Sequence, residues 1–252
     1  MVEWTKSEGV VLPIALAVCL VLAVIISVLT AKKSEKIRRI PLMILAIVVW
    51  GLEIAKQTLS ARGGYNLWSI PLHFCSLFLY FFPLAGFFGG KVGQFGRTMT
   101  FTCGSFFLLL FYFNPSTVIG SACDNVFGSF SVFHTFIYHH IIILFYLIMV
   151  MSRLYHPSKK DFLYVFVGIS VYAVVAISMA HILNVNFCNI LRSNISFMEA
   201  LRQSRGQVVY TFVMIIIGLA GGEVIVLVPN LCRKKKKEDS FSKIMKILKS
   251  EV

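Results

Sequence analysis

The stretch "SIPLHFCSLFLYFFPLAGFF" at residues 69–88 is apolar over nearly its whole length. A helix rises 1.5 Å per residue and the hydrocarbon core of a bilayer is about 30 Å thick, so about 20 such residues cross it. We therefore predict a membrane span at residues 70–88. Its first turn carries His73 and Cys75, and proton-exchanging side chains at such a place are typical of functional sites.

The rest of the chain has the composition of an integral membrane protein. Of 252 residues, 58% are hydrophobic and 14% are charged, and the mean hydropathy is +0.81. Further apolar segments lie at about 10–30, 41–59, 98–113, 132–151, 162–183 and 207–229. The predicted fold class is all-α: a polytopic membrane bundle of about seven transmembrane helices. Residues 1–230 form one domain, and residues 231–252 form a basic tail.

The positions of lysine and arginine predict the orientation of the chain. Basic residues follow the first, third, fifth and seventh spans, at "KKSEKIRR" (32–39), Lys91 and Arg97, 153–160, and "RKKKK" (233–237). Cytoplasmic loops carry the excess of basic residues. This pattern predicts an outside N-terminus, a cytoplasmic C-terminus and a multi-pass protein of the cell membrane. The loop before the seventh span, with Arg192, Arg202 and Arg205, departs from the pattern.

The net charge of +13 follows mainly from this topology. Because no nucleic-acid-binding motif accompanies it, a nucleic-acid partner is not expected. In the tail, apolar residues recur on one helical face and lysines lie off it, which predicts an interfacial helix on anionic lipid headgroups. A solvated tail is the alternative. Membrane lipids are the expected partners, and the sequence identifies no protein partner.

Metals and cofactors are not expected. The six cysteines have no CxxC or zinc spacing, and no HExxH motif occurs. A retinal Schiff base is excluded, since the seventh span contains no lysine. Cys123 and Cys188 both fall in outer loops, and both a disulfide between them and two unpaired thiols stay open.

Several polar residues fall at one depth, in the outer half of the membrane. Glu53, Lys56 and Gln57 share one face of the second span. This face is either a ligand site or the place of a Glu53–Lys56 ion pair that joins helices. The other members of this set are His73, Cys75, Asn114, His134, His139, His140, His181, Asn184 and Asn186. In a regular helix His73 and Cys75 point to nearly opposite sides, so each needs a partner from another span.

Five segments occur in an order that resembles one family: "EIAK", "PLHFCSLFLYFFPL", "FYFNPS", "FIYHHIIILFYLI" and "LNVNF". Over residues 41 to about 225 the chain is similar to the YwaF-like bacterial integral membrane proteins and their eukaryotic transmembrane acyltransferase relatives. The resemblance implies acyl transfer between phospholipids through a cysteine. It matches Glu53 and Lys56 to the family's acid and base, His73 and His139 to its histidines, and Asn186 to its asparagine.

One position departs from that family. Leu72 occupies the place of the nucleophilic cysteine, immediately before the span-three histidine. Cys75 follows three residues later, which in a helix puts it on the same face, about 4.5 Å along the axis. A reaction slows strongly when the catalytic group is displaced by such a distance from the reacting atoms.

The sequence favours an enzyme that acts on lipid acyl groups. The expected catalytic residues are His73, His139 and Cys75. The expected substrate-binding residues are Glu53, Lys56, Gln57, Asn114, His181, Asn184 and Asn186. A protein that binds or transports a small solute or protons is the main alternative, and a purely structural bundle is the third.

Overall fold

The computed structural model describes residues 5–250, and the side chains of all of these except 117 and 234–250. The described chain is all-helical. Its elements are α1 (Lys6–Thr30), α2 (Glu35–Arg62), η1 (Leu67–Ser69), η2 (Phe74–Ser76), α3 (Leu77–Phe87), α4 (Gly90–Phe113), α5 (Pro115–Ile119), α6 (Phe130–Met151), α7 (Lys160–Leu183), η3 (Phe187–Asn189) and α8 (Ser196–Ser250). Each predicted span corresponds to one of the helices α1 to α4 and α6 to α8, which confirms the predicted helical membrane bundle.

The helices differ in how well they meet the requirements of a span. Among the described residues, α1, α6, α7 and the Ser196–Arg233 part of α8 are long and apolar enough to cross a membrane. The apolar helix at Phe74–Phe87 is shorter, and α2 carries charged residues within its length. Four of the predicted spans thus meet both requirements among the described residues.

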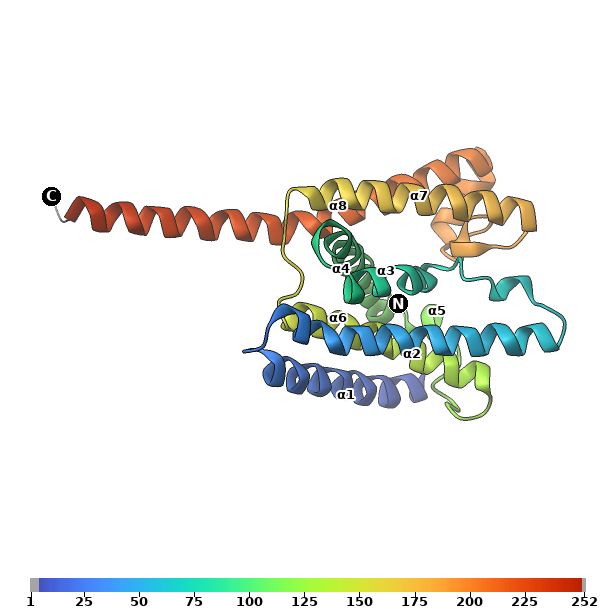
Figure 1. The fold of residues 1–252 in the computed structure, drawn as a ribbon. Coiled ribbons are helices and arrows are strands. Elements are labelled where there is room, and N and C mark those ends of the chain that lie inside the picture. The colour runs from blue at the N-terminus through green and yellow to red at the C-terminus, as the bar shows by residue number, and fades with distance from the viewer. Residues whose placement is uncertain (1–4, 251–252) are drawn as a thin grey trace.

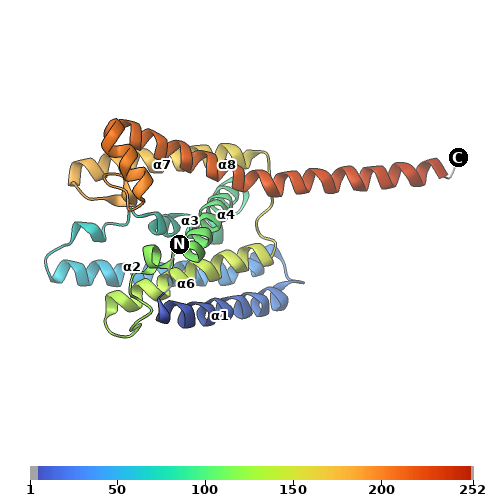
Figure 2. The same ribbon diagram turned by 180° about the vertical axis from the view of Figure 1, so that it is seen from behind.

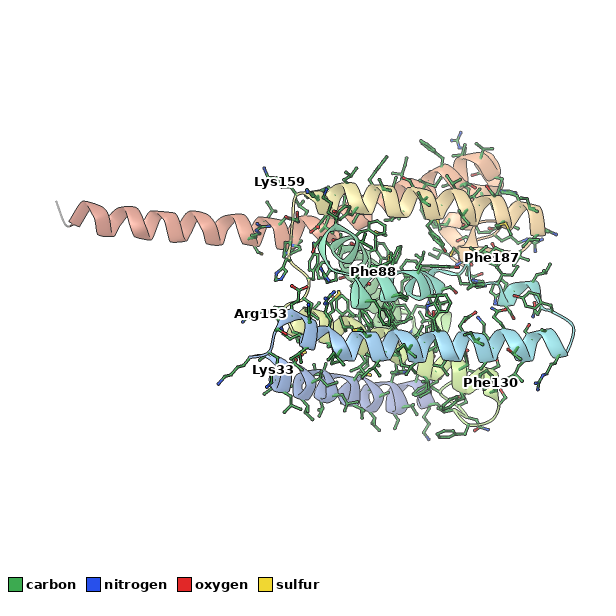
Figure 3. The ribbon with its side chains drawn as sticks, in the orientation of Figure 1. Lys33, Phe88, Phe130, Arg153, Lys159 and Phe187 are labelled. Carbon is green, nitrogen blue, oxygen red and sulfur yellow. The ribbon has the colours of Figure 1, made fainter. Side chains whose placement is uncertain are left out.

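The helices form two layers joined by a third. α1, α2 and α6 lie together on one side, α7 and α8 lie on the other, and α3 and α4 lie between them (Figures 1 and 2). Lys33, Arg153 and Lys159 lie toward one end of the bundle, and Phe130 and Phe187 toward the other (Figure 3). The basic loops between helices thus gather at one end, as the predicted orientation requires.

The central helices α3 and α4 approach each other closely. A side chain at Gly96 would meet the backbone of Ala85 and Leu84 at about 2.6 Å or less, so only glycine fits there. Small residues at such a contact allow two helix backbones to pack tightly in a membrane. Phe82 of α3 also stacks on Phe145 of α6 with 3.7 Å between ring centroids, which ties α3 to the first layer.

The predicted span at 70–88 begins later than expected. Residues 70–73 are not helical, η2 follows, and α3 starts only at Leu77. Pro71 explains the difference, because proline restricts the residue before it to extended conformations and has no N–H for a helical hydrogen bond. Leu72 and Cys75 therefore do not share one face of a helix, and the expected one-turn displacement between them is wrong.

The last helix is divided at Gly206, which has a φ of +85°. Before it, the Arg202 guanidinium contacts the Glu199 carboxylate at 2.5 Å and holds the pKa of that carboxyl at about 2. This ion pair offsets one charge of the loop that departed from the basic pattern. After it, α8 extends beyond the other helices as far as Ser250 (Figure 1). The side chains of the predicted interfacial face lie outside the described residues.

Candidate functional site

A polar cluster on α2 forms the centre of the candidate site. Lys56 Nζ lies 2.7 Å from Glu53 Oε1, and the Gln57 amide donates to the same oxygen at 2.6 Å. The Gln57 amide also donates to the Ser69 carbonyl at 2.6 Å, which ties α2 to the connection before α3. The Glu53–Lys56 ion pair, one of the two interpretations that the sequence left open, is present in the structure. The Glu53 carboxylate thus has a cation and an amide donor as its partners on α2.

His134 brings α6 to this cluster. Its Nε2 lies 3.9 Å from Glu53 Oε2, and both side chains are buried. Its ring stacks on Tyr138 at 5.2 Å between centroids, and the Tyr138 hydroxyl donates to the Cys75 carbonyl. The sequence resemblance selected His139 of α6, whereas His134 is the histidine that faces Glu53. A positional signal was available, since His134 and Tyr138 are four residues apart and share one helical face.

A cavity of about 300 Å³ opens beside Glu53, between α2 and the start of α3. Its lining residues are mostly apolar and are Trp50, Glu53, Ile54, Gln57, Thr58, Pro71, Leu79 and Tyr80. The Trp50 indole donates to the Leu79 carbonyl at 2.8 Å and fixes one wall. An apolar cavity with a few polar groups on its wall is typical of a ligand site, and 300 Å³ is at the lower end of the usual range of roughly 300–1,000 Å³.

His73 lies at the non-helical start of α3, next to this wall. Its Nε2 is 3.1 Å from the Trp68 carbonyl, and its ring packs against those of Trp68 and Phe187. A carbonyl oxygen only accepts hydrogen bonds, so Nε2 carries the proton and Nδ1 keeps a lone pair.

A second thiol lies beside the position of the missing nucleophile. Cys188 Sγ is 3.4 Å from the Leu72 carbonyl and 2.6 Å from the Tyr172 hydroxyl, which itself donates to that carbonyl at 2.8 Å. Cys188 comes from η3, and its φ is +50°. Burial raises the pKa of its thiol to about 12. From the sequence, Cys188 was either a disulfide partner of Cys123 or an unpaired thiol, and in the structure both cysteines are free thiols.

The remaining histidines of α6 lie in the protein interior. His139 is buried against Phe107, with 5.5 Å between ring centroids, and its Nδ1 has no hydrogen-bond partner. His140 donates through Nδ1 to the Phe136 carbonyl at 2.7 Å. Neither residue lines the cavity. The catalytic role predicted for His139 stays a prediction that the cavity wall does not support.

The polar residues at the ends of α4 and α7 lie apart from the cavity. Asn186 organises its own loop, accepting from the Leu191 and Arg192 amides and donating to the Arg192 carbonyl. Asn114 ends α4, and Asn184 ends α7 in the left-handed conformation. His181, in the last turn of α7, is exposed. Asn114, His181, Asn184 and Asn186 do not line the cavity, and their predicted roles in substrate binding stay predictions.

Within the part of the chain that the structure describes, no three His, Cys, Asp or Glu side chains gather as metal ligands would. An ion pair, two histidines and two thiols lie around the start of α3, and of these residues Glu53 is among those that line the cavity. These groups are suited to acid–base and nucleophilic chemistry.

Comparison with known proteins assigns the family. Residues 4–222 match the TMEM164 family, a family of transmembrane proteins. The match includes α1 to α7 and most of the apolar part of α8. Neither the curated proteins nor the solved structures gave a significant match. Because the family match spans more than four fifths of the 252 residues, the chain belongs to the TMEM164 family.

Proposed function

We propose that this protein is an enzyme of the cell membrane that transfers acyl groups between lipids. The observation that carries the proposal is the apolar cavity with Glu53, the ion-pair partner of Lys56, on its wall and with His73 and Cys75 on the segment that borders it. An acyl chain fits the apolar lining, and the Lys56 ammonium favours the oxygens of an ester or headgroup. The resemblance to acyltransferases in the sequence supports the same chemistry.

The proposed reaction has two steps. A cysteine thiolate attacks the ester carbonyl of a phospholipid, a thioester forms, and the lysolipid oxygen leaves with a proton. The hydroxyl group of an acceptor lysolipid then attacks the thioester, and the thiol regains its proton. His73, with the lone pair on Nδ1, is the proposed proton acceptor. Cys75 and Cys188 are the two candidate nucleophiles, and the contact of Cys188 with the Leu72 carbonyl makes it the alternative to Cys75.

A transfer assay tests this function. Purified protein in nanodiscs is given a phospholipid with a labelled acyl chain and an unlabelled lysolipid acceptor, and the products are separated by mass spectrometry. The expected result is a labelled acceptor phospholipid, formed by the natural chain and lost in His73→Ala. A natural chain that moves no label between several donor and acceptor classes would contradict the proposal.

Proton or solute binding is the second candidate function, because Lys56, Glu53 and His134 form a chain of buried and half-buried ionisable groups. Intramembrane chains of this kind are typical of proton relays. Proteoliposomes that contain a pH-sensitive dye test it. If the protein transfers no acyl groups but shows a proton flux that Glu53→Gln abolishes, proton binding or transport is favoured over acyl transfer.

A further inference from the structure

Three arginines lie at the end of the bundle that holds the basic loops, away from the cavity. Arg38 and Arg39 lie in the first turns of α2, and Arg97 lies two turns into α4. Arg39 and Arg97 both donate to the carbonyl of Phe88, which ends α3, at 2.6 and 3.4 Å. Arg38 donates to the Ser152 carbonyl at 2.7 Å, where α6 ends. We call Arg39 and Arg97, which share the Phe88 carbonyl and the Glu35 carboxylate, the arginine cluster.

The arginine cluster carries more positive charge than its surroundings neutralise. Arg39 Nε and Arg97 Nη1 each lie 3.9 Å from the same atom, Glu35 Oε1. The Arg97 side chain is buried, at 5% exposed, and that of Arg39 is partly buried, at 13% exposed, whereas Glu35 is 46% exposed. One exposed carboxylate at that distance serves a buried and a partly buried cation that also repel each other. Buried charges in proteins are normally paired, so a second anion is required to balance the cluster.

The cluster also has hydrogen-bond donors to spare. A guanidinium group has five N–H donors. Arg97 uses only Nη1, in two long contacts of 3.4 Å to the Ala85 and Phe88 carbonyls. The Nε atoms of Arg38, Arg39 and Arg97 are all buried without a hydrogen-bond partner. Hydrogen bonds to the carbonyls at the end of α3 therefore account for the Nη1 groups of Arg39 and Arg97. They leave the Nε donors without a partner.

The start of α4 adds a further feature that attracts anions. Its N-cap is Gly89, and no side chain accepts hydrogen bonds from its first turn. Arg39 Nη1 lies 3.8 Å from the place where a side chain would begin at Gly89, so the guanidinium adjoins this helix terminus. The free N–H groups and the dipole of a helix N-terminus favour negative charge.

We infer that the arginine cluster binds a phosphate group, as the monoester or diester of a lipid headgroup or as free phosphate. Phosphate oxygens accept the parallel hydrogen bonds of guanidinium groups and supply the missing negative charge. Bound phosphate would displace the exposed Glu35 carboxylate from its long contacts. The site lies at the inner membrane surface of the predicted orientation and is separate from the proposed acyl-transfer site.

The test is a binding titration with the full-length protein in a neutral detergent. The probe is dioctanoyl phosphatidic acid, and dioctanoylglycerol is the control without phosphate. Arg39→Gln is expected to weaken phosphatidate binding by about tenfold, the effect of losing a charge-assisted contact. Glu35→Gln removes the competing carboxylate and is expected to tighten binding about threefold. Lys33→Gln, in the same basic loop, is the matched control and should change binding less than about twofold.

Three results would overturn the inference of a phosphate site at the arginine cluster. Equal weakening by Arg39→Gln and Lys33→Gln would reduce the effect to general surface charge and overturn the inference. Binding that Glu35→Gln weakens, or dioctanoylglycerol binding as tight as that of phosphatidate, would do the same. A competition arm with inorganic phosphate then assigns the source: competition that depends on Arg39 identifies free phosphate as a ligand, and phosphatidate binding without such competition identifies the lipid headgroup. Circular dichroism of Arg39→Gln verifies that the variant is folded.

Discussion

Glu53 of α2 and His134 of α6 face each other with 3.9 Å between Oε2 and Nε2, while the other carboxylate oxygen binds Lys56 at 2.7 Å. One buried carboxylate thus connects a cation on its own helix with a histidine on another. Residues 81 positions apart meet beside the cavity because α2 and α6 pack in the same layer. This contact is the basis of the first two predictions.

The Glu53–Lys56 pair is expected to matter for stability as well as for function. Glu53→Gln leaves Lys56 without its partner, and we expect a loss of unfolding free energy near the lower end of about 3–5 kcal/mol, since Lys56 is one-quarter exposed. Glu53→Gln with Lys56→Met should recover most of the loss, because no charge is left unpaired. Thermal unfolding in detergent measures both. A double variant as unstable as the single one would contradict this account of the pair.

Variants of His134 and His139 distinguish a histidine that acts at the cavity from one that only packs in the interior. We expect His134→Gln to lower acyl transfer at least about tenfold with little change in melting temperature, because its ring faces Glu53. His139→Gln is expected to lower the melting temperature more than the activity, because His139 is buried against Phe107. The reverse pattern would restore His139 as the functional histidine and remove His134 from the site.

The two thiols are distinguished by trapping the acyl-enzyme. Whichever cysteine is the nucleophile, its alanine variant should lose both transfer and the covalent acyl adduct detected by intact-protein mass spectrometry. Cys103→Ala, a buried cysteine of α4 outside the cavity lining, is the control and should keep both. If Cys75→Ala and Cys188→Ala both keep full activity, covalent catalysis by these cysteines is excluded.

The reactivity of Cys188 should depend on pH in a specific direction. Burial raises the pKa of its thiol from 9.0 to about 12, so at pH 8 the folded protein holds about a thousandfold fewer thiolates there than the unfolded chain. In a variant that keeps only Cys188, iodoacetamide labelling of the folded protein should still be rising with pH above 9. The midpoint of the curve of labelling rate against pH gives the pKa of the Cys188 thiol, independently of how accessible the thiol is to the reagent. A midpoint near 7 would show an activated thiolate and favour Cys188 as the nucleophile.

Labelling from the two sides of the membrane tests the predicted orientation. Cys232 is exposed and should react with an impermeant maleimide only from the inside. Cys123 is only 5% exposed and is a poor outer probe, so Asp124→Cys, at the exposed neighbouring position, is the better one. It should react from the outside, in a background without the other cysteines. The opposite pattern would move the cavity to the inner half.

The sequence by itself determined the helical membrane bundle, since a run of about 20 apolar residues in lipid must satisfy its backbone hydrogen bonds internally. It also placed Glu53 and Lys56 on one helical face, because residues three apart on a helix are neighbours. The tertiary structure decided the rest. α3 starts only after Pro71. The packing of α6 places His134, and not His139, beside Glu53. The packing of η3 places Cys188 beside Leu72. Such contacts depend on how helices rotate and pack against one another, and a periodic apolar pattern does not specify that rotation.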